Sequence, residues 1–496
     1  MRKVTSQSRK ENKMDKSIIE KYQPVIGLEI HAQLATKSKI FASDSTEFGN
    51  LPNTNISVIT LGHPGTLPKL NKKVVEYAIK MGLACNCSIS PLTFFDRKNY
   101  FYPDLPKGYQ TTQDKAPICK GGFVMIKTKE GEKKINLNRI HMEDDAGKNM
   151  HLTGEVDTLV DYNRAGVPLI EIVTEPDLRS SEEAFVLMTE IRKLVRYLEI
   201  CDGNLEEGSL RCDANISIML KGSTTYGKKV EVKNMNSMRN VQRAIDFEIL
   251  RQIEELEKGN DVVSETRQFD ATTGETYGMR TKEELNDYRY FPEPDLQPLE
   301  ISEKWLNAIK AELPSLPHEL FERFTKEYKL PEYDAQVLTD AKEIALYFDE
   351  LCKHTKNYKA ASNWVMGPVK SYLNELTLHI EQFPISTQNM VDLIELVEAN
   401  KVSFASASQK IFPEMLKNGK SAIQVAESLN LIQESNSDAL VPVIEEVLAK
   451  YPAKVAEYKG GKTGILGLFM GEVMKVTKGK ADPKVATELL KERLDN

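Results

Sequence analysis

Several features that place a protein in a common class are scarce or missing in this chain of 496 residues. Only six cysteines are scattered along it, too few for the disulfide framework of a secreted protein, so a reducing compartment is expected. No run of about 18 apolar residues occurs, which argues against a membrane-spanning helix. We therefore predict a cytoplasmic protein without a membrane partner.

Motifs for covalent catalysis and for a phosphate-binding loop are missing as well. No G-x-S-x-G sequence is present to hold a serine nucleophile on a strand-to-helix turn. The stretch KGGKTG (459–464) is similar to the end of a P-loop, but Ala456 stands where glycine is needed and no strand pattern precedes it. Cys85, Cys87 and Cys119 fall one thiol short of a tetrahedral zinc site, so we expect them to be buried and idle.

Net charge gives no global signature of nucleic-acid binding, because the chain carries −7. The charge is uneven, however. From Lys450 to the C-terminus there are ten Lys or Arg against six Asp or Glu, a local charge of +4. A modestly basic tail on an acidic protein is compatible with a polyanionic partner.

Two kinds of hydrophobic pattern divide the chain and predict an α+β fold. Up to about residue 300, apolar and polar residues alternate at period two, which indicates strands. These segments are Val25–Leu34, Leu137–Glu143, Leu210–Ile218 and Lys229–Lys233. Helical patterns interrupt them at 180–200 and 238–257, and after about residue 319 only helical periods remain. Strands mixed with helices without a βαβ rhythm are typical of α+β proteins.

Alternation also decides which side chains share a strand face. In the first predicted strand, Leu28 and Ile30 point one way, and Glu29 and His31 point the other. The polar faces of the predicted strands carry Glu29, His31, Gln33, Arg211, Asp213, Asn215, Glu231 and Lys233. The run HMEDD (141–145) adds His141, Glu143, Asp144 and Asp145. A half-exposed antiparallel sheet would explain the alternation of any single strand.

The residue types on these faces favour a Mg²⁺–nucleotide site. Converging carboxylates repel one another unless a cation lies among them. Mg²⁺ prefers oxygen ligands and bridges to nucleotide phosphates. Arginine and lysine side chains then stabilise the transferring phosphoryl group. We expect this role for Arg211, Lys233, Arg267 and Arg280.

Eight motifs in order along the chain resemble the B subunit of the tRNA-dependent amidotransferases, the GatB/GatE family. They are VIGLEIHAQL, FDRKNYFYPDLPKGYQ, HMEDDAGK, NRAGVPLIEIVTEPD, EEGSLRCDANIS, VEVKNMNS, SETRQFD and DYRYFPEPDL. The resemblance runs from about Pro24 to the C-terminus and includes SNWVMG (362–367) and a tail similar to the YqeY family.

The resemblance implies an ATP-dependent ligase of the carbon–nitrogen type, with glutamine as amido donor. Its B subunit phosphorylates the side-chain carboxylate of misacylated Glu-tRNA(Gln), Asp-tRNA(Asn) or both, and ammonia then displaces phosphate. The implied cofactors are ATP and Mg²⁺. The implied partners are the amidase, or A subunit, which delivers the ammonia, a small C subunit, and the misacylated tRNA. Phosphorylation fits the chemistry, because an unactivated carboxylate has no good leaving group.

The same resemblance assigns roles to the polar faces. Catalytic roles are expected for Glu29, His31, Asp213 and Lys233. Nucleotide contacts are expected from Arg211, Glu231, Asn234, Asn236, Arg267 and Arg280. The Mg²⁺ ligands, direct or through water, are expected to be Glu29, His31, Glu143 and Asp144.

Two aromatic segments are expected at the entrance for the tRNA acceptor end. The stretch 96–113 is too broken by proline and glycine for a helix, and 290–295 repeats its composition. Aromatic rings beside Lys and Arg stack on unpaired bases and hold the adjacent phosphates. The residues concerned are Tyr100, Tyr102, Lys107, Tyr109 and Arg289. The alternative is that these rings only fix loops onto the domain or onto the amidase partner.

One departure from the family concerns zinc. Many members carry C-x-C and C-x-x-C pairs that bind structural zinc, but here the corresponding positions hold Ala42, Asp44, Ser57 and Thr60. We therefore expect no structural zinc.

The domain organisation implied has four parts. They are a disordered polar extension (1–21), a strand-rich cradle domain with the kinase and transamidase site (22–305), an all-α helical domain (306–420) and an α-helical YqeY-like tRNA-binding tail (421–496). Two alternative hypotheses for the function remain open. One is a non-catalytic protein that binds tRNA or assists assembly, and the other is a free-standing carboxylate–amine ligase for a small molecule.

Overall fold

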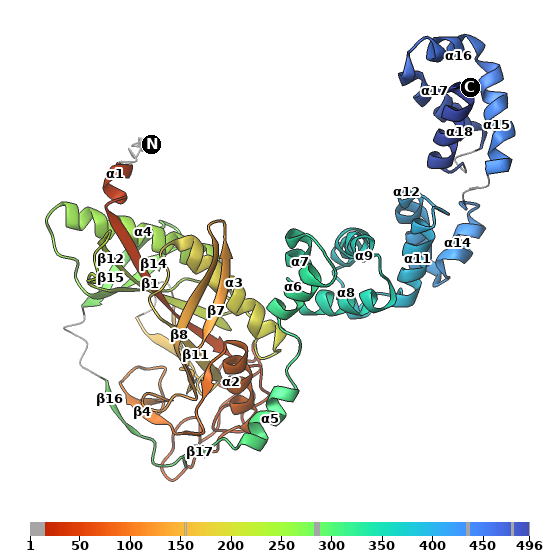
Figure 1. The fold of residues 1–496 in the computed structure, drawn as a ribbon. Helices are drawn as coiled ribbons and strands as arrows, with labels where there is room; N and C mark the ends of the chain where they lie inside the picture. Colours follow the sequence, from red (N-terminus) through yellow and green to blue (C-terminus); the bar gives the residue numbers. More distant parts are fainter. Residues whose placement is uncertain are drawn as a thin grey trace, which may run out of the picture. The chain divides into compact units, whose positions relative to one another are not determined.

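The computed structural model describes residues 15–152, 154, 156–281, 288–432, 437–477 and 481–495, without the side chains of 280–281 and 437–439. The chain forms two compact units, one ending at Leu316 and the other beginning at Pro317 (Figure 1). The first unit mixes strands and helices, and the second is helical throughout its described part. The predicted α+β class is thus confirmed.

A ten-stranded mixed sheet forms the frame of the first unit, in the order β15-β14-β13-β12-β1-β11-β8-β6-β2 with β7 also paired to β8. All of its pairings are antiparallel except β13 with β14. In chain order the strands are β1 (Tyr22–Gln33), β2 (Ser88–Ile89), β6 (Cys119–Lys120), β7 (Phe123–Thr128), β8 (Gly131–Asp144), β11 (Pro168–Thr174), β12 (Leu210–Leu220), β13 (Val230–Lys233), β14 (Glu265–Asp270) and β15 (Glu275–Thr281). All four strands expected from sequence are present, and β1 and β8 are longer than predicted.

One face of this sheet is apolar and carries helices. Helices α3 (Ser181–Tyr197) and α4 (Met238–Glu257) pack against each other and over it, and α2 (Lys72–Ala84) packs against β8 (Figure 1). Leu28 and Ile30 of β1 are buried beneath them, as alternation predicts. Each such side chain contributes roughly 1.5–3 kcal/mol relative to exposure. The opposite face of β1 is therefore free to carry polar groups.

A smaller three-stranded sheet brings the two aromatic segments together. Its order is β16 (Arg289–Pro292), β4 (Asp96–Asn99) and β5 (Tyr109–Thr112), and β5 also packs on β8. Tyr290 stands opposite Lys98 across the β16–β4 pair. Segments almost two hundred residues apart in sequence are thus neighbours beside the main sheet.

The remaining elements of the first unit are short. They are α1 (Lys16–Ile19), β3 (Leu92–Thr93) paired with β17 (Leu299–Glu300), β9 (Lys148–His151) paired with β10 (Thr158–Asp161), and α5 (Glu303–Ala311). Helix α1 falls inside the extension predicted to be disordered. Asp15 caps this helix by accepting a hydrogen bond from the Ser17 backbone N–H. Residues 1–14 of that extension lie outside the described residues. Helix α5 packs on α2, so this unit extends past residue 305.

The second unit consists of two groups of helices. The first group is α6 (Pro317–Lys326), α7 (Glu332–Leu338), α8 (Lys342–His354), α9 (Tyr358–Trp364), η2 (Val365–Val369), α10 (Lys370–Leu376), η3 (Ile380–Gln382), α11 (Thr387–Glu398), α12 (Phe404–Ser406), η4 (Ala407–Ile411), α13 (Phe412–Asn418) and α14 (Ala422–Ser428). The second group is α15 (Ser437–Lys450), α16 (Pro452–Lys459), η5 (Thr463–Ile465), α17 (Leu466–Val476) and α18 (Pro483–Asp495). Helix α14, assigned by sequence to the tail, packs on α11 and α13.

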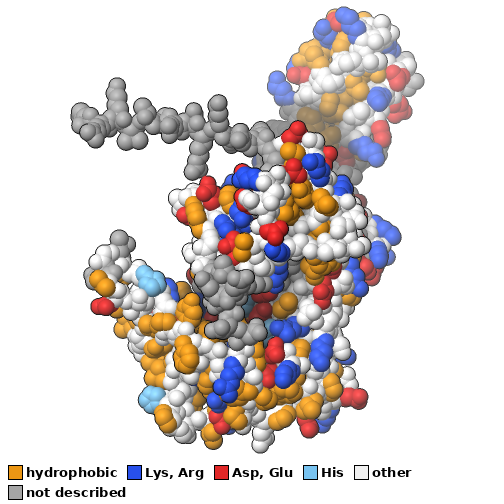
Figure 2. Space-filling model, turned by 90° about the vertical axis from the view of Figure 1, so that its left-hand side faces the viewer, with side chains coloured by type: hydrophobic (Ala, Val, Ile, Leu, Met, Phe, Trp, Pro, Cys, Tyr) orange, Lys and Arg blue, Asp and Glu red, His pale blue; other side chains and the backbone are white. Residues whose placement is uncertain are grey.

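The last helices have their own apolar core, built from residues between Leu440 and Leu494. In the view of Figure 2, basic and acidic side chains are interspersed over the described surface. Among the described residues, no helix is long and apolar enough to cross a membrane.

Candidate active site

A row of charged side chains crosses four neighbouring strands on the polar face of the main sheet. The strand registers place Arg211 of β12 opposite His31 of β1, His31 opposite Glu171 of β11, and Glu171 opposite His141 of β8. Directly opposite residues in antiparallel strands lie within side-chain contact. The register therefore sets two imidazoles on either side of one carboxylate.

Glu171 and Glu143 hold both imidazoles. Nε2 of His31 lies 3.5 Å from Glu171 and 3.8 Å from Glu143, and Nε2 of His141 lies 3.3 Å and 3.7 Å from the same carboxylates. Burial opposes protonation of His141, but these carboxylates outweigh it and raise its pKa to about 9. The pKa of Glu171 is lowered well below its usual value, because both imidazoles more than offset its burial. His31, Glu143 and Glu171 present ligand atoms within 4.8 Å of one another.

A second cluster lies beside the first and consists of Glu29, Asp213 and Glu231. Their carboxylates also offer atoms within 4.8 Å of one another. Lys233 binds two of them, with Nζ 2.5 Å from Asp213 and 2.9 Å from Glu231. Glu29 instead accepts from the amide of Asn215 at 2.8 Å. Burial, together with the charges of Glu171 and Glu231, raises the pKa of Glu29.

A third group of contacts centres on Asp145. Its Oδ2 accepts from Arg211 at 2.7 Å and from Gln33 at 2.7 Å, and Arg164 lies 3.7 Å away. Although burial raises the pKa of Asp145, the two arginines lower it below the ordinary value. This carboxylate is therefore already neutralised by protein groups.

Apart from Gln33 and Asn215, these side chains line one cavity of about 470 Å³, here called the acidic pocket. Its outer wall comes from the small sheet and the chain beside it. Lys98 lies 4.6 Å from the ring centre of Tyr288 and 5.7 Å from that of Tyr100. The rings of Tyr100 and Tyr288 meet edge-on at 5.5 Å, and Tyr290 lines the same wall.

The donor set of the acidic pocket fits Mg²⁺. Carboxylate oxygens are the ligands this ion takes, and several carboxylates meeting in one cavity gain from a cation among them. The raised pKa of Glu29, caused by burial and then by two neighbouring carboxylates, records the repulsion that a divalent cation would relieve. In the Glu29 cluster, the Lys233 ammonium already supplies one positive charge.

The structure brings together eight of the seventeen expected site residues. Those that line the acidic pocket are Glu29, His31, Tyr100, Glu143, Arg211, Asp213, Glu231 and Lys233. The other expected residues with described side chains lie outside this pocket, because of the way their strands face or their turns run.

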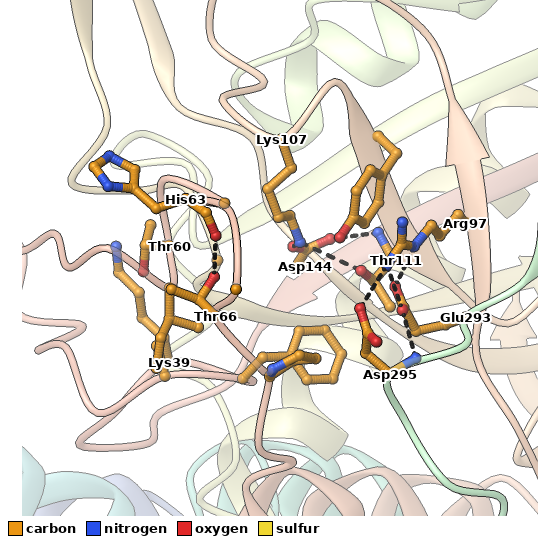
Figure 3. Close-up of a pocket in the computed structure, with 18 residues that line it drawn as sticks. Lys39, Thr60, His63, Thr66, Arg97, Lys107, Thr111, Asp144, Glu293 and Asp295 are labelled. Carbon is orange, nitrogen blue, oxygen red and sulfur yellow. Dashed lines mark hydrogen bonds and ion pairs between the residues drawn. The ribbon is translucent and has the colours of Figure 1, made fainter.

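Asp144 lies apart from the other three expected Mg²⁺ ligands. Because side chains alternate along β8, Glu143 points into the acidic pocket and Asp144 points to the other side. There it lines a second cavity of about 240 Å³, here called the paired pocket (Figure 3). Its carboxylate lies 2.5 Å from Nζ of Lys107 and accepts from the Thr111 backbone at 2.7 Å.

A further expected nucleotide contact, Arg267, also lies outside the acidic pocket. Arg267 stands opposite core-facing Val232 and so points toward α4, where it lies 2.5 Å from Glu265 and 3.6 Å from buried Glu248. Arg280 pairs with Thr266 in β15, and its side chain lies outside the described residues.

The two asparagines after β13 are also displaced from the pocket. Asn234, at φ 67°, turns the chain and donates to the Phe269 carbonyl at 3.3 Å. Asn236 accepts from Asn240 of α4 at 2.7 Å.

The residues expected at the tRNA acceptor end divide between three places. Tyr100 lines the acidic pocket, whereas Lys107 and Tyr109 line the paired pocket, with Nζ of Lys107 4.9 Å from the ring centre of Tyr109. Tyr102 and Arg289 are exposed beside these walls, Arg289 lying over the ring of Phe291.

Several residues of the acidic pocket were missed from sequence. Glu171 was findable, because it is the single charge within the otherwise apolar strand PLIEIVT. His141 shares a face with Glu143, which the pattern HMEDD shows. Lys98 lies in the aromatic segment 96–113 that the sequence analysis singled out, but Arg139 and Tyr288 were not expected, since their place depends on the small sheet packing beside β8.

The positions at which relatives are expected to carry zinc ligands hold an oxygen-rich contact instead. Asp44 accepts from the hydroxyl of Ser57 at 2.9 Å and from that of Thr60. Its backbone carbonyl accepts from Lys39 at 3.0 Å. Soft thiolates, the usual ligands of structural zinc, are replaced by hard oxygens here, so this place does not fit the ion. All six cysteines of the chain lie buried, including Cys85, Cys87 and Cys119, for which burial was expected.

Comparison with known proteins agrees with this architecture. Residues 24–307 match the GatB/GatE catalytic domain, and residues 346–494 match the GatB domain. The chain is 50% identical over 474 residues to the B subunit of aspartyl/glutamyl-tRNA(Asn/Gln) amidotransferase from Trichlorobacter lovleyi, covering 96% of this chain and 99% of the relative. It is 50% identical over 484 residues to the protein of that name in Thermosynechococcus vestitus, covering 96% and 97%. The chain belongs to the GatB/GatE family.

Proposed function

We propose that this chain is the B subunit of a tRNA-dependent amidotransferase and activates the side-chain carboxylate of misacylated Glu-tRNA(Gln), Asp-tRNA(Asn) or both. The observation that carries the proposal is the meeting of two carboxylate clusters in one cavity, within a chain of this family. ATP would be the phosphoryl donor, and Mg²⁺ would be held by residues of the two clusters.

The reaction has two steps. An oxygen of the substrate carboxylate attacks the γ-phosphorus of ATP, and ADP leaves with the electron pair of the broken P–O bond. Ammonia then attacks the acyl carbon, inorganic phosphate leaves, and the nitrogen loses a proton to give the amide. Mg²⁺ neutralises phosphate charge when bound.

The chain's own residues prepare the pocket for this chemistry. His31 is held by Glu171 and Glu143, which fixes the orientation of its ring. Lys233 holds Asp213 and Glu231 in place, and its ammonium supplies a cation beside the transferring phosphate. The tyrosine wall limits the access of water to the acyl phosphate.

The partners proposed are the misacylated tRNA, an amidase that supplies ammonia, and a small third subunit. The basic tail beyond Lys450 is proposed to bind tRNA, and the complex is proposed to work in the cytoplasm. The relatives are named as B subunits, which agrees with a multi-subunit enzyme.

The test uses the co-purified complex with ATP, Mg²⁺, ammonium or glutamine, and labelled Glu-tRNA(Gln) or Asp-tRNA(Asn). Labelled amide should form only with ATP, and Asp213→Asn should reduce its formation by about 100-fold or more while tRNA binding persists. Asp261→Asn, at an aspartate whose side chain is 88% exposed, is the matched control and should be neutral. If wild type forms no amide even with ammonium, the better description is a non-catalytic tRNA-binding protein.

A further inference from the structure

The positive charges that line the acidic pocket are not equivalent. Arg211 and Arg164 both point to Asp145, and Lys233 binds the carboxylates of the second cluster. Among the residues that the structure describes, Lys98 and Arg139 are the two pocket-lining Lys or Arg without a carboxylate partner.

Arg139 has spare hydrogen-bonding capacity. Its Nη1 donates to the Asp114 backbone carbonyl at 3.3 Å, and its buried Nε has no partner within the described residues. An orphaned buried donor is costly, so native proteins retain one where a ligand, ion or water completes it. The Arg139 guanidinium is therefore open to an anion from the cavity.

The strand register places this guanidinium at one end of the pocket. Arg139 stands opposite Val173, which stands opposite Glu29, so its Cα lies two strand spacings, or about 10 Å, from that of Glu29. The cluster of Glu29, Asp213 and Glu231 lies on β1, β12 and β13. Arg139 lies on the β8 side, where Tyr290 and Lys98 form the wall.

We propose that Arg139 binds the side-chain carboxylate of the amino acid esterified to tRNA, before and during its phosphorylation. This inference rests on the proposed function. Through the metal ion, nucleotide phosphates would be drawn to the cluster of Glu29, Asp213 and Glu231, which leaves the cation on β8 for the second anion. A guanidinium offers a carboxylate two parallel N–H donors, whereas an ammonium is a point charge.

The test compares Arg139→Ala and Arg139→Lys with wild type in the whole complex, using ammonium as nitrogen donor. The KM for Glu-tRNA(Gln) should rise at least tenfold in Arg139→Ala, and the KM for ATP should stay within twofold. Inhibition by the product Gln-tRNA(Gln) should change less than twofold, because its side-chain amide carries no negative charge. Arg139→Lys should recover part of the loss.

Lys134 supplies the matched control, because it lies on the same strand, is exposed and contacts the ring of Phe123 outside the pocket. Lys134→Ala should leave all three constants unchanged. A rise in the KM for ATP instead would assign Arg139 to the nucleotide and overturn the proposal. Equal weakening of Glu-tRNA and Gln-tRNA binding, with a lower melting temperature, would show that Arg139 only holds the chain at Asp114, beyond the end of β5, and would overturn the proposal too. Failure of wild type to make amide is a different result and concerns the proposed function.

Discussion

The acidic pocket and the paired pocket lie on opposite sides of the end of β8, and both are rich in charge. In the paired pocket the charges balance locally. Lys107 is bound to Asp144, and Arg97 lies 2.7 Å from Glu293 and 2.9 Å from Asp295 (Figure 3). In the acidic pocket, carboxylates such as Glu29 and Glu143 meet in clusters instead.

The difference shows that a count of charged residues does not identify a functional site. A carboxylate paired with an adjacent cation holds elements together. Clustered carboxylates repel one another, and a cation bound from solution can relieve this repulsion. Two neighbouring residues of one strand, Glu143 and Asp144, fall into these two classes only because their side chains point in opposite directions.

The largest effect is expected from Glu171→Gln, which tests whether the acidic pocket carries the activity. Removing the charge between His31 and His141 should lower kcat for amide formation by about 100-fold and raise the Mg²⁺ concentration needed for half-maximal rate. Steady-state rates over a Mg²⁺ titration measure both. Glu175→Gln, at the end of the same segment and bound to Asn138, is the matched control.

The corresponding change in the paired pocket is Asp144→Asn. It should lower the melting temperature, because the half-buried Lys107 ammonium loses its partner, and leave the Mg²⁺ requirement unchanged. An altered Mg²⁺ requirement would show that the two pockets are not electrostatically separate.

A smaller effect is expected from Tyr100→Ala in the wall of the acidic pocket. Loss of this ring should raise the KM for charged tRNA several-fold, since stacking contributes about 1–3 kcal/mol per base. Phe101→Ala is the comparison, because this neighbouring ring is 92% exposed and lines neither pocket. Equal tRNA kinetics in wild type and Tyr100→Ala would mean that Tyr100 only supports the wall.

The smallest effect concerns Lys39 in the paired pocket. Burial lowers the pKa of this lysine to about 8, although Asp44, Asp161 and Asp144 act in the opposite direction. Below pH 8 the folded and unfolded chains are both protonated here. Between pH 8 and the ordinary pKa of 10.5, the unfolded chain binds more protons, so this group makes stability rise with pH.

The measurement is the melting temperature of wild type and Lys39→Met from pH 7.5 to 9.5. Relative to the variant, wild type should gain about 2–4 °C over this range. Parallel curves would mean that the lysine stays charged in the folded protein, and that the paired pocket solvates it better than its burial suggests.

Much of the site was predictable because β1, β12 and β13 are central strands with one buried face. Period-two alternation placed Glu29, Asp213 and Glu231 on one side, and the register then made them neighbours. Arg267 was expected in the pocket without knowledge of the register of its strand. In the structure it stands opposite core-facing Val232 and faces α4. A shift of one residue in register reverses the facing of every side chain.

The sequence was enough to predict the α+β class, four strands of the main sheet with their polar faces, and the family to which the chain belongs. These depend on local periodicity and on motifs that can be read residue by residue. The tertiary structure was needed to show that Asp144 lines the paired pocket, that Glu171 lies beside His31, and that Arg139 lines the acidic pocket without a carboxylate partner among the described residues. The physical reason is that these outcomes depend on strand register and on packing between distant segments, which no local pattern records.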